Sequence, residues 1–550
     1  MAFGKAVASL ALLLLSMTVG LRGQAWSEPE ISNIEAVAKR LAASSTQREA
    51  ILALQEMSDG SVAALLRALK EGALYRWKEK IALLAEDGVL KDLRGQPILD
   101  ERGQPVAPEV GQEAIVLDEQ LFGLVQRILE RLEIFSLDRE ARKSAAFKLG
   151  NSGDLSAILV LTKAAGQETD GEVRVVIEEG LAKLQLLTLD PATRMRAAQT
   201  LGRLRSEASL PQLKTMVQSE ADSQVNQAIT KSIQSIESFI VIRNAVGYLF
   251  NGISLGAVLL LMSLGLAVTF GLMGIINMAH GEMLMIGSYT AYVVQELFAT
   301  HLAAQQDYYF FAALPLSFLV AGAVGLALEV GILRFLYGRP LETLIVTWGI
   351  GMIFQQSARL YFGDQTSVNS PTWFRGGFEV LEGLIFPWSR IFIVALALLA
   401  LAALYFLLYR SYAGLRVRAV MQNRGMASCL GVSTRKLDAL TFALGTALAG
   451  MAGCAIALIG TVDPEVGKTY IVDSFLVVVL GGVGKLIGTV VVSFGIGLGN
   501  KLLEPAIGGT AAAIYAKVTI LVVVIWFLQW KPTGLFPSKG RAAEAQGSET

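Results

Sequence analysis

Residues 271–292 read GLMGIINMAHGEMLMIGSYTAY, and this stretch decides how the rest of the chain is interpreted. It continues an uncharged run from Asn244 to Ala279 and then places Asn277, His280 and Glu282 within six positions of one another. Such polar side chains at membrane depth usually face a bundle interior or a water-filled path, because bilayer hydrocarbon solvates them poorly. The stretch is therefore a candidate functional site within a membrane. The alternative is that His280 and Glu282 sit at a helix end in the headgroup layer.

The composition indicates a membrane protein of several domains. The chain has 550 residues, of which 53% are hydrophobic and only 17% charged. Most of the charged residues lie in residues 27–243, whereas 244–530 is apolar with sparse charge. The net charge of zero averages these two halves, and it gives no support to nucleic-acid binding, which needs a clustered basic surface.

The first 25 residues read as a secretory signal. Lys5 supplies the positive start, Ala6–Val19 the apolar core and Gly23–Ala25 a small-residue exit. The apolar core is about 21 Å long as a helix, which is short of the roughly 30 Å of bilayer hydrocarbon. We therefore expect cleavage, and we expect the domain that follows to lie outside the cytoplasm.

Residues 26–243 are expected to form an exported helical domain with HEAT-like repeats. Two segments match at an offset of 52 residues, and the matching pairs are Asp138 with Asp190, Ala145-Ala146 with Ala197-Ala198, and Leu149-Gly150 with Leu201-Gly202. After the glycine the register is expected to slip by three, so that Leu155 corresponds to Leu210. Residues 86–118, rich in Gly and Pro, are expected to form a loop or hairpin. Such repeats stack into a curved surface, which serves either as a docking site for a partner or as a passive spacer.

Nine apolar runs follow in residues 244–537, and they predict an all-α membrane bundle of about eight or nine spans. The runs are 247–270, 279–298, 309–333, 341–361, 389–409, 438–461, 470–483, 487–503 and 512–530. Run 470–483 is short enough to be a half-helix. Three small-residue motifs favour close helix packing: Gly252 with Gly256, Ala449 with Gly453, and Gly495 with Gly499.

The distribution of basic residues agrees with the signal segment about orientation. If residues 27–243 lie outside, nine spans place the loops 334–340 and 410–437 and the tail 538–550 in the cytoplasm. These segments carry most of the Arg and Lys of the membrane half. The positive-inside rule predicts the same arrangement independently.

Several motifs resemble those of one transporter family, the permeases of ABC importers of the branched-chain amino acid type. The motifs are Ile276–Glu282 followed by Met285, Gly287 and Tyr289; Thr347–Gly351; Ala427–Ser433 with Phe442–Gly445 and Leu448–Gly453; Gly481–Lys485; and Pro532–Phe536. The resemblance covers roughly 244–537. The signal segment and helical domain ahead of the permease, with Trp348 and Lys485, resemble the urea-transporting branch of that family.

The resemblance implies an inner-membrane permease subunit of a bacterial importer. It implies three kinds of partner, namely a second similar permease, two cytoplasmic ATPases and a periplasmic substrate-binding protein. It implies path residues among Asn277, His280, Glu282 and Tyr289. It also implies that a short helix in the loop 410–437 sits in a cleft of an ATPase, with coupling candidates Arg416, Arg418, Arg424 and Gly431. The physical role of Gly431 is a helix C-cap, and the basic residues alternatively act as a positive-inside stop signal.

Catalytic functions find no support in the sequence, and no cofactor is expected. A phosphate-binding loop needs two glycines, but Val462 and Val479 occupy the first of these positions in the two nearest matches. ATP hydrolysis is therefore expected in another chain. His280 and Glu282 imitate half of a zinc deaminase site without its Cys-x-x-Cys partner. Cys429 and Cys454 are expected to be small packing residues.

The cargo is open at this stage. Urea is small and neutral, so a path for it needs paired donors and acceptors without a buried counter-charge. A branched-chain amino acid or short amide uses the same machinery. Two further alternatives are a membrane-anchored repeat scaffold and a passive urea channel. Glu329, inside the third run, is expected to pair with Arg334 or another basic residue.

Overall fold

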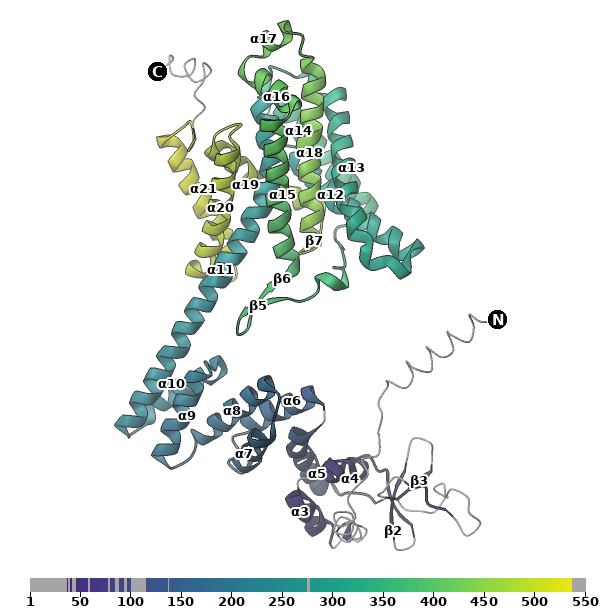
Figure 1. Ribbon diagram of the computed structural model, residues 1–550, viewed down its shortest axis with the longest axis vertical. Coiled ribbons are helices and arrows are strands. Elements are labelled where there is room, and N and C mark those ends of the chain that lie inside the picture. The colour runs from purple at the N-terminus through teal and green to yellow at the C-terminus, as the bar shows by residue number, and fades with distance from the viewer. Residues whose placement is uncertain are drawn as a thin grey trace. The chain divides into compact units, whose positions relative to one another are not determined.

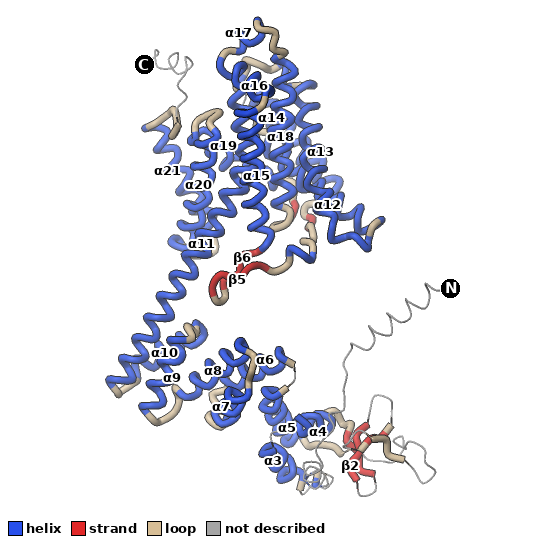
Figure 2. The backbone as a smooth tube through the Cα atoms, viewed as in Figure 1, coloured by secondary structure: helices blue, strands red, loops and turns tan. Residues whose placement is uncertain are grey.

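The computed structural model describes residues 37, 40–41, 46–57, 60–77, 80–84, 89–92, 96–99, 115–136, 138–274 and 277–536. The signal-like segment 1–25, Ile276 and the tail 538–550 lie outside this part of the chain. Contacts divide the protein into two compact units, Met1–Ile240 and Val241–Thr550. Helices dominate both units (Figure 2).

The first unit begins with helices packed beside a small sheet. Helices α3 (Gln47–Met57), α4 (Gly60–Lys70) and α5 (Glu119–Leu132) share a core of buried leucines and isoleucines. Strands β1 (Leu74–Trp77), β2 (Lys80–Leu84) and β3 (Leu90–Lys91) form an antiparallel sheet, with Leu74 opposite Leu83. The prediction of an all-α fold is wrong here. Leu74 at the start of β1 is fully buried in the core that these helices share.

The later part of the first unit repeats one set of contacts at an offset of 52 residues. Its helices are α6 (Arg139–Gly150), α7 (Ala157–Gln167), α8 (Gly171–Gln185), α9 (Pro191–Arg203), α10 (Leu210–Ser219) and the start of α11 (Ser223–Met273), with 3₁₀ turns η1 (Glu133–Phe135) and η2 (Glu207–Ser209). Asp138 and Asp190 cap α6 and α9. The Arg142 guanidinium donates to Glu168 as Arg194 does to Glu220.

The predicted slip in register within this repeat is wrong. Leu161 and Leu213, 52 residues apart, are both fully buried on α7 and α10, whereas Leu155 is half exposed. The same offset relates Glu168 and Glu220, which follow α7 and α10 and pair with Arg142 and Arg194. Backbone contact adds to this, since a Cβ on Gly150 would lie 2.3 Å from Gly180 Cα.

The second unit is a helical bundle with short helices at one end and a hairpin at the other (Figure 1). Its elements after α11 are α12 (His280–His301), η3 (Ala303–Tyr308), α13 (Tyr309–Gly331), η4 (Leu333–Phe335), α14 (Pro340–Phe362), β4 (Thr366–Ser367), η5 (Thr372–Phe374), β5 (Gly377–Leu381), β6 (Leu384–Pro387), α15 (Trp388–Arg410), α16 (Tyr412–Gln422), α17 (Arg424–Cys429), α18 (Thr434–Ile456), β7 (Thr461–Val462), α19 (Val466–Gly481), α20 (Leu486–Ile507) and α21 (Ala512–Trp530). Strand β4 pairs with β7, and β5 pairs with β6.

Six described helices are long and apolar enough to cross a membrane. They contain the segments Ser223–Gly271, Ala303–Phe335, Trp388–Arg410, Thr434–Ile456, Leu486–Ile507 and Ala512–Trp530. Three more helices, α12, α14 and α19, occupy the remaining predicted runs. Helix α12 carries His280 and Glu282 near its start, and α19 has 16 residues and is shorter than the six.

Glycines set the close approach of the central helices. A Cβ on Gly287 of α12 would lie 1.9 Å from the Gly450 carbonyl oxygen of α18, so only glycine fits there. The predicted packing role of Gly252 is confirmed, since its Cβ would lie 2.8 Å from Leu498 Cα. The predicted motif on α20 is confirmed at Gly499, whose Cβ would lie 3.3 Å from Ile520 of α21, and is wrong at Gly495, where no atom lies within 4 Å of a Cβ. Gly497 makes the contact with α11.

Candidate functional site

A buried carboxylate and amide pair lies between α12 and α14. Gln355 Nε2 donates a hydrogen bond to Glu282 Oε1, and the two residues are only 8% and 5% exposed. Gly351, one turn earlier on α14, makes room for the carboxylate, because a Cβ there would lie 3.1 Å from Glu282 Cδ. Glu282 Oε2 has no hydrogen-bond partner among the described residues. The pair therefore retains an unused acceptor inside the bundle.

His280 is the first residue of α12 and is fully buried. Its Nε2 lies 3.2 Å from the Met262 carbonyl oxygen on α11. A carbonyl oxygen only accepts hydrogen bonds, so Nε2 carries the proton and donates. The ring also packs against α11 at Gly265, where a Cβ would lie 3.1 Å from Cε1. This contact holds the start of α12 against α11.

The alternative placement of His280 and Glu282 is correct in one respect. Both lie in the first turn of α12, which is a helix end. Both are also enclosed by the helices of this chain, with relative exposures of 0% and 5%. They do not face outward from this bundle.

The turn before α12 is held by one hydrogen bond within itself and by one to α14. Asn277 is buried, and its Oδ1 accepts from the Ala279 amide at 3.1 Å. The Met278 amide donates to Thr347 Oγ1 of α14, also at 3.1 Å. Asn277 Nδ2 has no hydrogen-bond partner within the described part of the chain. This turn therefore adds an unused donor to the same buried region.

Tyr289 lies two turns further along α12, beside a groove between α12, α13 and α14. Its ring stacks on Phe362 with centroids 4.4 Å apart, and its hydroxyl has no hydrogen-bond partner among described residues. The groove has a volume of about 530 Å³ and is almost wholly apolar, with Thr290 and Ser357 among the few polar residues that line it. Gly351 belongs to the predicted motif Thr347–Gly351, whereas Gln355 was missed from the sequence. Two adjacent glutamines inside an apolar run were the available signal.

An ion-pair cluster joins the end of α14 to the start of α19. Arg359 Nη2 lies 3.2 Å from Glu465 Oε1, and Arg359 Nε lies 2.9 Å from Asp364 Oδ1. Lys468 lies 3.5 Å from the same Glu465 oxygen. The hydrogen bond from Arg359 lowers the pKa of Glu465, so this carboxylate is charged near neutral pH. Sequence reasoning missed this cluster because its members lie about a hundred residues apart.

Helices α16 and α17 occupy the loop 410–437. Gly431, at φ +84°, follows α17 in a Schellman motif, because the Gly431 amide donates to the Ser428 carbonyl and the Val432 amide to the Ala427 carbonyl. The predicted helix C-cap role of Gly431 is confirmed. Arg424 begins α17 and forms an ion pair with Asp438 of α18.

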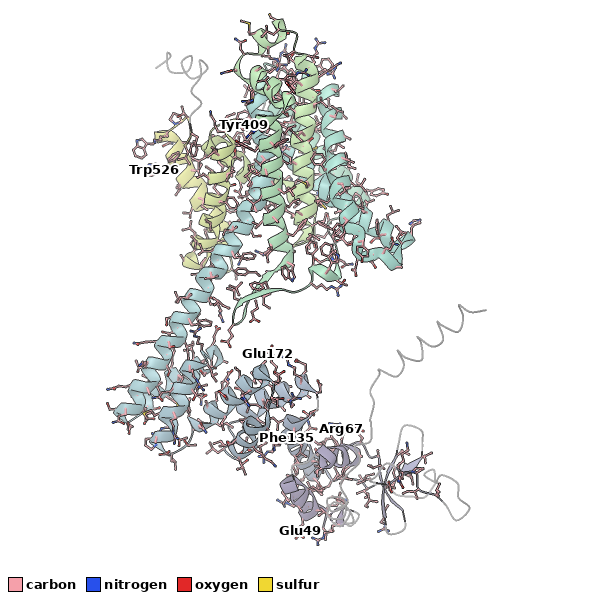
Figure 3. The ribbon with its side chains drawn as sticks, in the orientation of Figure 1. Glu49, Arg67, Phe135, Glu172, Tyr409 and Trp526 are labelled. Atoms are coloured by element: carbon pink, nitrogen blue, oxygen red, sulfur yellow. The ribbon has the colours of Figure 1, made fainter. Side chains whose placement is uncertain are left out.

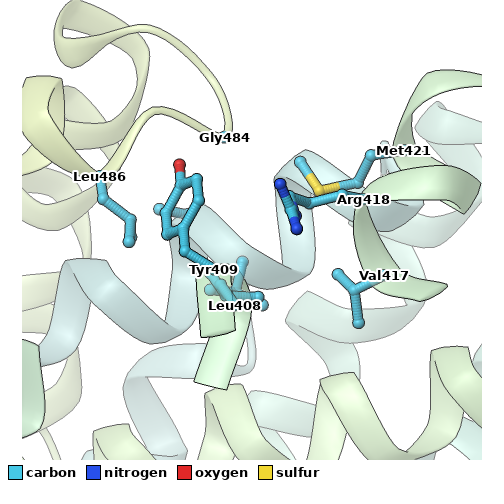
Figure 4. Close-up of a pocket in the computed structure, with 9 residues that line it drawn as sticks. Leu408, Tyr409, Val417, Arg418, Met421, Gly484 and Leu486 are labelled. Carbon is cyan, nitrogen blue, oxygen red and sulfur yellow. The ribbon is translucent and has the colours of Figure 1, made fainter. Parts of the chain in front are cut away.

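The other two basic coupling candidates lie on α16, apart from Arg424. Arg416 and Arg418 are both exposed. The Arg418 guanidinium carbon lies 5.3 Å from the centroid of the Tyr409 ring. Arg418 and Tyr409 line a small pocket of about 60 Å³, which Met421 and Gly484 also line (Figure 4). Tyr409 lies near the end of α15, and Trp526 lies on α21 (Figure 3).

The expected pairing of Glu329 with Arg334 is wrong. Glu329 Oε1 accepts instead from the Tyr337 hydroxyl at 2.6 Å. Arg334 lies over the Phe335 ring. The turn after η4 brings Tyr337 back toward α13, and helical spacing alone does not predict that reversal.

Comparison with known proteins places this bundle in a family. Residues 248–528 match the family described as branched-chain amino acid transport system, permease component. The chain belongs to this family. As a permease component it is a multi-pass membrane protein and a transport subunit, and the prediction that it is not an enzyme is confirmed.

Three relatives illustrate the extent of the similarity. The permease is 29% identical over 293 residues to the high-affinity branched-chain amino acid transport system permease protein BraD of Pseudomonas aeruginosa, covering 52% of this chain and 94% of that protein. It is 28% identical over 299 residues to LivH of Salmonella typhimurium, with the same coverage. It is 27% identical over 285 residues to a probable LivH of Methanocaldococcus jannaschii, covering 50% and 88%. No solved structure matches the permease.

Proposed function

We propose that this permease forms, with a second similar permease, the translocation path of an ABC importer for a branched-chain amino acid. Two cytoplasmic ATPases supply the energy, and a periplasmic binding protein delivers the cargo. The observation that carries the proposal is the buried Glu282–Gln355 pair between α12 and α14. Buried ionisable groups in membrane helices are costly and mark substrate pathways.

The path is proposed to use unsatisfied polar atoms near that pair. Glu282 Oε2, Asn277 Nδ2 and the Tyr289 hydroxyl have no hydrogen-bond partner in the described chain. An acceptor, a donor and a hydroxyl are what an ammonium, carboxylate or amide group needs when it leaves water. His280 is proposed to brace this arrangement through its contact with Met262.

Urea, or a short amide, is the second candidate cargo. Asn277, Tyr289 and Gln355 offer uncharged donors and acceptors beside Glu282. A neutral solute can be bound by such groups, whereas an amino acid brings two charges at a large desolvation cost. The names of the relatives favour the amino acid, and this donor set favours urea.

The topology is proposed to have eight or nine spans, with α12, α14 and α19 considered in addition to the six candidate segments. Helix α12 packs against α13 and α18, both within apolar candidate spans, so it shares their depth. With residues 1–25 removed as a signal, residues 26–243 lie in the periplasm. The spans occupy residues 244–537, and the tail 538–550 is cytoplasmic. The inner membrane of a bacterium is the proposed location.

Coupling to the ATPases is proposed to occur through α16 and α17. Arg416 and Arg418 are exposed, and Arg418 also lies over the Tyr409 ring, whereas Arg424 is held by Asp438. The two exposed arginines suit an acidic cleft. Gly431 ends α17 and sets its direction.

The first unit is proposed to be a HEAT-like repeat domain that docks a partner. The support is the set of matched contacts at the 52-residue offset, such as Arg142 with Glu168 and Arg194 with Glu220. A passive spacer is the other possibility for this domain. If the chain is instead a membrane-anchored scaffold, substituting Gly431 leaves the phenotype intact and deleting residues 31–240 abolishes it.

The test is uptake of labelled leucine and labelled urea by cells with and without this gene. If cells without the gene lose energy-dependent uptake of leucine alone, the principal proposal is supported. If they lose uptake of urea alone, urea is the cargo. A parallel strain carries a partner ATPase whose nucleotide-binding lysine is replaced. Uptake that persists in this strain contradicts an importer and supports a passive channel.

A further inference from the structure

Four side chains from separate elements meet at the end of the second unit where α16 and α17 lie. Arg424 of α17 pairs with Asp438 of α18. The Arg424 guanidinium carbon also lies 5.4 Å from the centroid of the Tyr337 ring. The Tyr337 hydroxyl donates to Glu329 Oε1 of α13 at 2.6 Å. The contacts form one continuous series from α18 through α17 to α13.

Two of these four side chains are buried carboxylates, and Arg424 is the one cation of the four. Asp438 is fully buried and Glu329 is 2% exposed, whereas the Arg424 side chain is 43% exposed. Arg424 therefore reaches inward from the surface helix α17 to the buried Asp438 carboxylate. Glu329 Oε2 has no hydrogen-bond partner among described residues, so Tyr337 supplies the hydrogen bond that Glu329 has. If Arg424 moved away, the buried Asp438 carboxylate would lose this partner, at a large electrostatic cost.

Tyr337 also has a position that links this group to the polar site. It lies in the turn between η4 and α14, immediately before Gly338, whose φ of +80° reverses the chain. Helix α14 then carries Thr347 and Gln355, which bond to the turn before α12 and to Glu282. A shift of Tyr337 therefore acts on the first turn of the helix that forms one wall of the site.

We propose that Arg424, Tyr337 and Glu329 are positioning residues that transmit movement of α17 to α14 and so to the Glu282–Gln355 pair. Asp438 anchors the arginine. This inference rests on the proposed function, in which α17 contacts an ATPase. A merely structural role for the same residues would change assembly or stability, and it would not separate ATP hydrolysis from transport.

The experiment uses the complete importer in proteoliposomes, with labelled leucine and labelled urea as probes and with ATP hydrolysis measured in the same vesicles. Tyr337→Phe keeps the ring under Arg424 and removes only the hydroxyl. We expect hydrolysis stimulated by the binding protein to stay within about twofold of the unaltered importer. We expect cargo moved per ATP to fall at least fivefold. Arg424→Lys, which keeps the charge but loses the planar fork, is expected to act in the same direction.

The matched control is Tyr515→Phe, because Tyr515 lies on α21, outside the polar site and outside α16 and α17, and is 58% exposed. It is expected to leave cargo moved per ATP unchanged. An unchanged ratio in Tyr337→Phe would overturn the inference, and so would a proportional loss of both activities with loss of copurified ATPase. If the unaltered importer moves neither probe when ATP is supplied, the proposed function itself fails.

Discussion

Glu168→Gln should weaken the first unit at one identifiable place. The Glu168 carboxylate is 5% exposed and accepts from Arg142 Nε at 2.7 Å and Nη2 at 3.1 Å. It also accepts from the amides of Thr169 and Asp170. An amide side chain has one acceptor oxygen in place of two, so the substitution leaves part of this set unpaired.

The expected magnitude follows from this geometry. Removing one member of a well-buried ion pair costs roughly 3–5 kcal/mol, and a single hydrogen bond to a charged group contributes roughly 1.5–3 kcal/mol. Because the Arg142 side chain is 18% exposed and water can partly replace its partner, we expect the lower range, about 2 kcal/mol. That value corresponds to an equilibrium constant for local opening that is about 30-fold larger.

Hydrogen exchange of the full chain, followed by mass spectrometry, measures this opening locally. We expect protection in α6 to α8 to fall about 30-fold in Glu168→Gln, and Glu220→Gln to do the same in α9 and α10. The control is Glu172→Gln, since the Glu172 side chain is 66% exposed and should change protection less than about threefold. Equal effects of Glu168→Gln and Glu172→Gln would refute the reasoning.

Three further outcomes are expected. The hydrogen bond from Arg142 lowers the pKa of Glu168, so its stabilising contribution is present above the ordinary carboxylate pKa and is lost as pH falls through the lowered value; protection should converge between Glu168→Gln and the unaltered chain in acid, and a constant gap would contradict this. Gly287→Leu should prevent folding because a Cβ there lies 1.9 Å from a carbonyl oxygen, whereas Gly349→Ala, with no atom within 4 Å, should express normally in membranes; equal expression would count against the packing. Gln355→Leu should reduce uptake at least tenfold by leaving Glu282 unpaired, and unchanged uptake would remove that pair from the path.

Much of the architecture could be predicted from local sequence pattern. The apolar runs locate the helices of the second unit because each span must satisfy its backbone within itself. The repeat in the first unit is visible because Asp138 and Asp190 must cap equivalent helices. The small sheet was missed because strands as short as Leu74–Trp77 carry too little periodicity to outweigh the helical pattern around them.

Only the site residues on α12 and in the turn before it could be predicted from the sequence. Asn277, His280 and Glu282 stand out because three polar groups within six positions at the end of a long uncharged run are unusual. Their partners come from distant segments, as Met262 and Gln355 do, and one sequence gives no register between α12 and its neighbours. The error at Gly495 has the same origin, because adjacent small residues on α20 face different helices and sequence spacing cannot choose between them.

The most direct test of the central claim is cargo uptake by proteoliposomes that contain the purified importer, with ATP supplied on the ATPase side and the binding protein on the other. We expect labelled leucine or urea to accumulate above its external concentration only when ATP and both permeases are present. Accumulation of cargo by this chain without ATPases would contradict the assignment of the chain as the permease subunit of an ABC importer. So would cargo that reaches equal concentrations on the two sides of the membrane whether or not ATP is present.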